Sequence, residues 1–109
     1  MMSVSPDLIE RAQSLAVRPH VTTADLNRTI GDLERAMRDS FVRPGWMPLR
    51  PPEEGDAALV WDGTCLWYDN RKPGRKPEIV RLSSAPKPVR IAAAGTVQNL
   101  YDLCTEPWP

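Results

Sequence analysis

Four cationic side chains lie close together directly after two aromatic residues, Trp67 and Tyr68, in the second half of the chain. These cations are Arg71, Lys72, Arg75 and Lys76. Cations that neutralise phosphates, beside rings on which bases stack, are the ingredients of single-stranded nucleic-acid binding. Arg81 and Arg90 follow at alternating positions of two later predicted strands, where they would extend the basic surface. The 71–90 segment therefore indicates nucleic acid as one candidate partner.

A simpler role accounts for the same charges. The chain as a whole carries 14 basic and 14 acidic residues, so its net charge is zero and a general attraction to polyanions is not expected. A charged loop also protects sheet edges against aggregation, and Arg81 and Arg90 fit the solvent side of a sheet equally well. Nucleic-acid binding is therefore the second of our two functional hypotheses.

The first hypothesis rests on tryptophan. Four of the seven aromatic residues are tryptophans, and a tryptophan on an extended segment is a typical anchor at protein interfaces, although Trp46 would also suit a core. The residues that we expect at an interface are Trp46, Met47, Trp67 and Trp108. We therefore expect a small non-enzymatic protein-binding module, such as an adaptor, inhibitor or assembly factor. Its expected partner is another protein or a second copy of itself.

Residues that could support catalysis or bind a metal do not form a recognisable pattern. His20 is the only histidine, and no cysteine or acid pair lies near it at the spacing of metal ligands. Glu53, Glu54 and Asp56 occupy a turn in which adjacent acids are typically solvated. The chain has no glycine-rich phosphate loop, nucleophile elbow or zinc signature. We therefore predict no catalytic residue, no metal site and no cofactor.

The sequence also bears on the cellular compartment. Its first residues lack the basic start and apolar run of a secretory signal, and no apolar stretch approaches the ~20 residues that span a bilayer. We therefore expect a cytoplasmic protein without a membrane partner, in which Cys65 and Cys104 are reduced. Eleven arginines against three lysines suggest GC-rich coding, as in a bacterium or a bacterial virus.

The length of 109 residues allows one hydrophobic core, so we predict a single domain over 1–109. Twelve prolines, clustered at 44–52 and 73–88, predict connections rather than helix interiors. The predicted class is α+β, with two N-terminal helices, a small antiparallel sheet of three or four strands and a short C-terminal helix. The corresponding segments are a helical part at 5–41, a proline-rich crossover at 43–56, a sheet at 57–92 and a helix at 96–104.

Two helices are predicted before the crossover. Ser5, followed by proline and aspartate, is a typical helix start. Thr22 or Thr23 opens the second helix, with Asp25 placed as in a capping box. Apolar residues then recur at steps of four and three, which predicts one buried helical face. They are Leu26, Ile30, Leu33, Met37 and Phe41.

Asp62-Gly63 between two apolar runs predicts a β-hairpin with a two-residue type I′ turn. That turn would place Trp61 opposite Thr64 and Leu59 opposite Leu66. Alternation puts Leu59, Trp61, Leu66 and Tyr68 on one face, and Ala58, Val60, Cys65 and Trp67 on the other. Neither face is polar, so both require cover from other elements or from a partner.

The segment after the basic loop is less strongly specified. Residues 78–82 are predicted as a third strand and 89–92 as a fourth, before a final helix opened by Thr96. A single helix from Val89 onward is the competing interpretation, and Gly95 argues against it.

Overall fold

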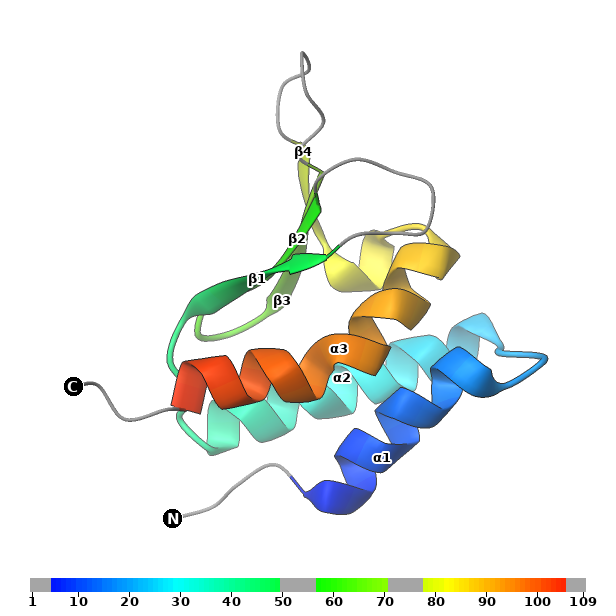
Figure 1. The fold of residues 1–109 in the computed structure, drawn as a ribbon, viewed down its shortest axis with the longest axis horizontal. Helices are drawn as coiled ribbons and strands as arrows, with labels where there is room; N and C mark the ends of the chain where they lie inside the picture. The colour runs from blue at the N-terminus through cyan, green and yellow to red at the C-terminus, as the bar shows by residue number, and fades with distance from the viewer. Residues whose placement is uncertain (1–4, 50–56, 71–77, 106–109) are drawn as a thin grey trace.

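The computed structural model of the chain describes residues 5–49, 57–70 and 78–105. A layer of helices packs against a four-stranded antiparallel sheet (Figure 1). The helices are α1 (Pro6–Ser14), α2 (Thr23–Asp39) and α3 (Lys87–Thr105), with single 3-10 turns η1 (Leu15–Val17) and η2 (Leu82–Ser84). The strands β1 (Gly45–Leu49), β2 (Ala57–Trp61), β3 (Leu66–Asn70) and β4 (Glu78–Arg81) are neighbours in chain order. The predicted α+β class is confirmed.

Both predicted helix starts are confirmed by their capping contacts. The Ser5 hydroxyl accepts a hydrogen bond from the Asp7 N–H at 3.3 Å, and the Thr22 hydroxyl accepts one from the Asp25 N–H at 3.1 Å. Each bond satisfies one of the amide groups that the first turn of a helix leaves without an internal acceptor.

The end of α2 differs from the prediction, because the helix stops at Asp39 and Phe41 lies outside it. Phe41 has a positive φ of 54°, and its N–H donates to the Arg38 carbonyl while the Val42 N–H donates to the Met37 carbonyl, both at 3.1 Å. These two bonds form a Schellman motif, in which glycine is the usual residue at the left-handed position. The motif turns the Phe41 side chain to solvent, where 89% of its surface is exposed.

The hairpin lies where it was predicted, but its register is shifted by two residues. Trp61 lies opposite Leu66 and Leu59 opposite Tyr68, so the loop holds the four residues 62–65. Gly63 has a positive φ and Asp62 does not, which rules out a type I′ turn. Because side chains alternate with a period of two, the predicted sorting of residues between the two faces survives the shift.

The predicted strand at 89–92 is wrong. The fourth strand of the sheet is β1, which pairs with β2 at the edge opposite β4. α3 begins at Lys87 and runs through Gly95, which confirms the competing interpretation of a single helix. Pro88 lies in the first turn, where proline is tolerated. The remaining strand, β1, lies inside the predicted crossover. Its Pro48 is compatible with a strand because β1 is an edge of the described sheet.

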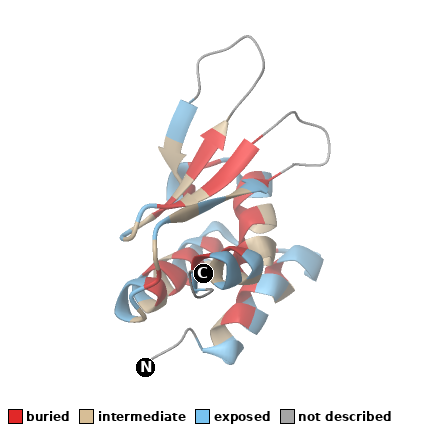
Figure 2. Ribbon diagram, turned by 60° about the vertical axis from the view of Figure 1, so that its left-hand side comes forward, coloured by how far each residue is buried: buried red, intermediate tan, exposed pale blue. Residues whose placement is uncertain are grey.

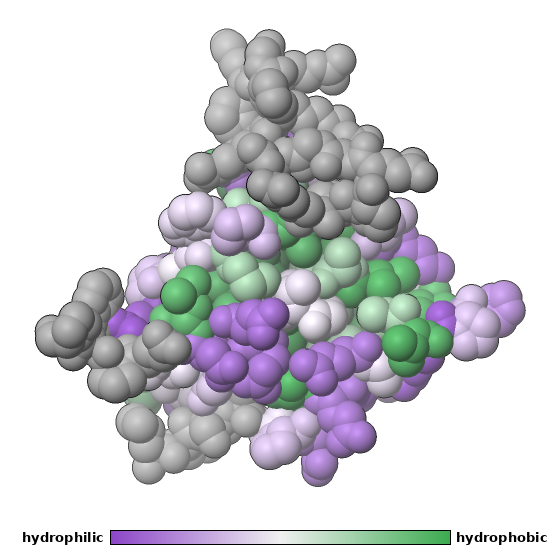
Figure 3. All heavy atoms as spheres, in the orientation of Figure 1, coloured by the Kyte–Doolittle hydropathy of each residue, from purple (hydrophilic) through white to green (hydrophobic). Residues whose placement is uncertain are grey.

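One face of the sheet joins the helices in the hydrophobic core. Leu59, Trp61 and Leu66 are almost fully buried there, and the Trp61 indole donates to the Val42 carbonyl at 2.9 Å. Figure 2 shows the central strands as mainly buried and the two edge strands as partly exposed. Figure 3 shows apolar surface across the middle of the face that carries α3, with hydrophilic surface around it. Among the described helices, none combines the length and hydropathy that a membrane span requires.

Candidate functional site

The sheet face away from the helical core carries a row of neighbouring side chains. Trp46 lies opposite Val60, Val60 opposite Trp67, and Trp67 opposite Arg81. We call these four residues the outer row. Trp46 exposes 52% of its surface, and the other three residues are partly exposed. None of the four belongs to the core cluster of the described residues. The row therefore presents two indoles, an aliphatic group and a guanidinium on one surface.

The next row of the same face is buried at its centre and exposed at both edges. Ala58 and Asp69 are buried, whereas Pro48 on β1 is exposed and Ile79 on β4 exposes 59% of its surface. The exposed part of the outer face therefore runs along the outer row and includes Pro48 and Ile79 at the two edges. Strands in a sheet are about 4.8 Å apart, so the surface extends roughly 14 Å from β1 to β4.

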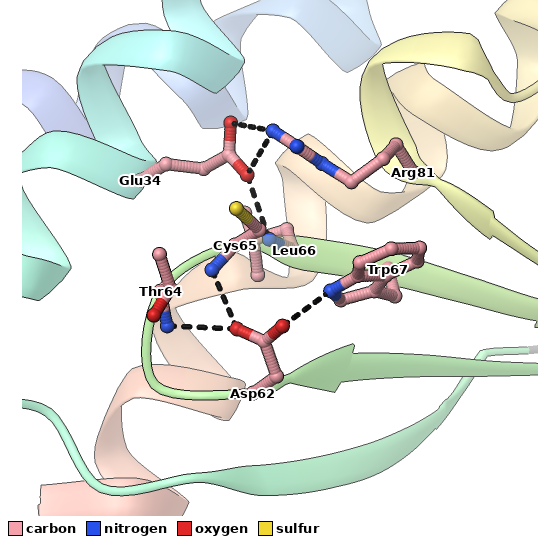
Figure 4. A network of polar contacts seen from close by, with 7 residues as sticks. All are labelled: Glu34, Asp62, Thr64, Cys65, Leu66, Trp67 and Arg81. Atoms are coloured by element: carbon pink, nitrogen blue, oxygen red, sulfur yellow. Dashed lines mark hydrogen bonds and ion pairs between the residues drawn. The ribbon is translucent and has the colours of Figure 1, made fainter.

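Asp62 fixes the hairpin loop and orients the Trp67 indole (Figure 4). Its Oδ1 accepts hydrogen bonds from the N–H groups of Thr64 at 2.7 Å and Cys65 at 2.6 Å, and its Oδ2 accepts one from the indole N–H of Trp67 at 2.7 Å. This arrangement is an Asx-type turn, in which a side chain replaces the backbone acceptor. The side-chain contacts explain why the loop has four residues rather than two.

The same contacts set the ionisation of Asp62. Partial burial alone would raise the pKa of this carboxyl group. The hydrogen bonds from Cys65, Thr64 and Trp67, together with the positive charge of Arg81, outweigh that effect and hold the pKa below its ordinary value of 3.8. Asp62 is therefore ionised at neutral pH, as three donors require.

Glu34 of α2 connects the helical layer to the same end of the sheet. Its carboxylate accepts a hydrogen bond from the Leu66 N–H at 2.7 Å and lies 3.2 Å from the Arg81 guanidinium (Figure 4). The Arg81 guanidinium also lies 5.7 Å from the centre of the Trp67 ring, within cation–π range. Trp67 is thus held by a carboxylate at its N–H and by a cation at its ring, and its orientation in the outer row is fixed.

The predicted protein-binding residues are only partly brought together. Trp46 and Trp67 share the outer row, but Met47 points to the opposite face, where it packs against the core. Trp108 lies outside the described residues. The orientation of the Met47 side chain follows from strand alternation, because consecutive residues of β1 point to opposite faces of the sheet. Ile79 was not predicted as a site residue, although its alternation with Val80 indicates the outer face.

The predicted nucleic-acid-binding residues do not form one surface within the described chain. Arg90 is buried in α3 rather than exposed on a strand, and its guanidinium donates to the Asn27 side chain at 2.8 Å. Arg81 is engaged with Glu34 and Trp67. The other four predicted cations, Arg71, Lys72, Arg75 and Lys76, lie outside the described residues.

The two cysteines are free thiols, as predicted. Cys104 is buried, and this burial raises its pKa despite the nearby positive charge of Arg43. The reactive thiolate form is therefore disfavoured. Within the part of the chain that the structure describes, no group of three or more histidine, cysteine, aspartate or glutamate residues could hold a metal ion.

Comparison with known proteins gives no match: no family model fits the chain, and no curated protein or solved structure is significantly similar to it.

Proposed function

We propose that the chain is a small non-enzymatic protein-binding module whose contact surface is the outer row together with Ile79. The observation that supports this proposal best is the placement of Trp46 and Trp67 in one cross-strand row outside the core, with Trp46 half exposed. Tryptophan and arginine are the residue types most enriched among those that dominate binding energy at protein interfaces.

The polar contacts around Trp67 favour binding rather than simple exposure. Asp62, Glu34 and Arg81 fix the indole before a partner arrives, so little side-chain freedom remains to be lost on association. Ile79 adds an aliphatic contact at the sheet edge. We therefore expect a partner that lays an apolar segment across the strands.

Nucleic-acid binding is the weaker of the two hypotheses. Of its six predicted cations, one is buried and one is tied to a carboxylate, so the four cations of the 71–77 segment would carry the interaction. A fluorescence-anisotropy titration with labelled single-stranded DNA and RNA at several salt concentrations tests this alternative. Phosphate contacts would give a linear loss of log affinity with log salt concentration.

The experiment for the main proposal compares two double variants. Trp46→Ser with Ile79→Ser removes apolar groups from the outer face. Val17→Ser with Phe41→Ser removes two apolar groups of the helical layer that are more exposed than Trp46 and Ile79, since Val17 is 83% and Phe41 89% exposed. Light scattering over a concentration series measures self-association, and affinity purification followed by titration of the isolated partner measures binding to another protein.

We expect the outer-face variant to weaken the complex by about 30-fold or more, because anchor residues of an interface contribute at least ~2 kcal/mol. The helical-layer variant should bind like the wild type. Equal binding by both variants would show that the outer row is not the interface. A chain that stays monomeric and retains no protein at any concentration would contradict the proposal altogether.

A further inference from the structure

A pocket between the first two helices has three arginines among its six lining residues. It has a volume of about 180 Å³, which far exceeds the ~10–15 Å³ that one water molecule needs. Its lining residues are Arg11, Leu15, Arg18, Asp25, Arg28 and Thr29. We propose that this cavity binds a phosphate-class oxyanion, either inorganic phosphate or the phosphate group of a small monoester.

The lining residues come from two segments that converge on the cavity. Arg11 lies in the last turn of α1, Leu15 begins η1, and Arg18 directly follows η1 with an extended backbone. Arg28 and Thr29 lie three and four positions after Asp25, in the first two turns of α2. On α2, residues at these steps share one side of the helix. The arginines therefore line this open pocket from both sides, where they could contact an anion together.

The charges around the cavity leave two guanidinium groups available. Arg11 is paired with Asp32 across the helices at 2.5 Å. Arg18 and Arg28 form no ion pair or hydrogen bond with the described residues. Asp25 is the only carboxylate in the lining, so three positive charges face one negative charge there. The positive end of the α2 dipole adds to the same field.

Guanidinium chemistry favours oxyanions. Each group presents parallel N–H donors that match the oxygens of phosphate in a two-pronged contact, and it remains charged at every physiological pH. The Thr29 hydroxyl supplies a further donor on the α2 wall. Asp25 opposes binding, which makes its removal a useful test.

The cavity is separate from the proposed protein-binding surface. In Figure 1 the turn between η1 and α2 lies at one side of the molecule, and the hairpin loop between β2 and β3 lies at the other. An oxyanion could therefore occupy the cavity while a protein occupies the outer row. The two proposals can fail independently.

The experiment is an NMR titration of the isotope-labelled chain with inorganic phosphate and, separately, with methyl phosphate. Sodium chloride holds the ionic strength constant. We expect saturable shifts confined to residues around the cavity, and the tighter of the two ligands identifies the source of the phosphate. Arg18→Gln with Arg28→Gln should weaken binding at least tenfold, because each lost charge-assisted hydrogen bond costs about that factor. Asp25→Asn should strengthen binding severalfold.

The matched control is Arg35→Gln with Arg38→Gln. It removes the same charge from exposed positions of α2 outside the cavity, and it should leave the affinity unchanged. Equal losses in the two double variants, or shifts spread over all basic surfaces, would show only general charge attraction and overturn the proposal. If the cavity variant failed to fold, Asp25→Asn would decide the question, since unchanged or weaker binding by that variant contradicts the site.

Discussion

The two faces of the sheet use tryptophan in opposite ways. Trp61 on the inner face is completely buried, and its indole N–H is satisfied by the Val42 carbonyl, so its position depends on core packing. Trp67 on the outer face is partly exposed and is held by Asp62 and Arg81. The inner face is thus ordered by burial and the outer face by charge. We expect the inner face to respond to loss of volume and the outer face to loss of charge.

The largest effect should come from the inner face. Trp61→Ala removes a fully buried ring and leaves the Val42 carbonyl without its donor. The expected loss is about 3–5 kcal/mol of unfolding free energy, which is measured by urea denaturation followed by circular dichroism. If this variant does not fold, Trp61→Phe provides a smaller step. A loss below ~1 kcal/mol for Trp61→Ala would show that the inner face is not packed as described.

A smaller effect is expected at the outer face when charge is removed. Asp62→Asn retains one side-chain oxygen and replaces the other with an amide group that cannot accept a hydrogen bond. We expect a loss of about 1 kcal/mol at pH 7, because one of the three donors loses its acceptor. Trp67 fluorescence should shift with the loss of its contact. Replacing the other three tryptophans, Trp46, Trp61 and Trp108, with phenylalanine assigns the change to Trp67.

The pH dependence of this effect has a definite sign. Because the pKa of Asp62 is lower in the folded chain than its ordinary value of 3.8, its charge stabilises the fold above that value. The contribution is lost as the pH falls through the lower, folded-state pKa. The wild type and Asp62→Asn should therefore differ in unfolding free energy at pH 7 and converge in strong acid. A constant difference from pH 7 to pH 2 would contradict the proposed role of the charge.

The smallest effect on stability should come from Trp46→Ser. Half of this side chain is already in solvent, and the residue lies on an edge strand. A change of less than ~1 kcal/mol in unfolding free energy is expected from urea denaturation, well below that of Trp61→Ala. A loss as large as that of Trp61→Ala would mean that Trp46 serves the fold rather than a partner.

Local signals in the sequence predicted much of this architecture. Ser5 and Thr22 mark helix starts because each satisfies a nearby amide without help from the rest of the fold. β1 escaped prediction because Pro48 and its neighbours resemble a connection, and only the position of the strand at a sheet edge makes proline acceptable. Gly95 argued against a continuous α3, yet it lies within that helix and packs against η1, where the Ala16 Cβ lies 3.6 Å from the position that a Cβ of Gly95 would take.

The candidate sites depended more on distant contacts than on local pattern. Strand alternation was enough to put Val60 and Trp67 on one face, but the pairing with Trp46 required β1. The arginine-lined cavity depends on how α1 crosses α2, and the sequence carries no local mark of that crossing. Arg90 likewise looked like a surface cation until its helix placed it against Asn27.

The four-residue loop held by Asp62 also bears on how this hairpin can change in evolution. Adding or removing two residues changes which side chains lie opposite one another but leaves each on its own side of the sheet, as the comparison of predicted and observed registers shows. Adding or removing one residue would turn Trp67 toward the helices and Leu66 toward solvent. Natural or selected length variants of this loop should therefore differ by even numbers of residues.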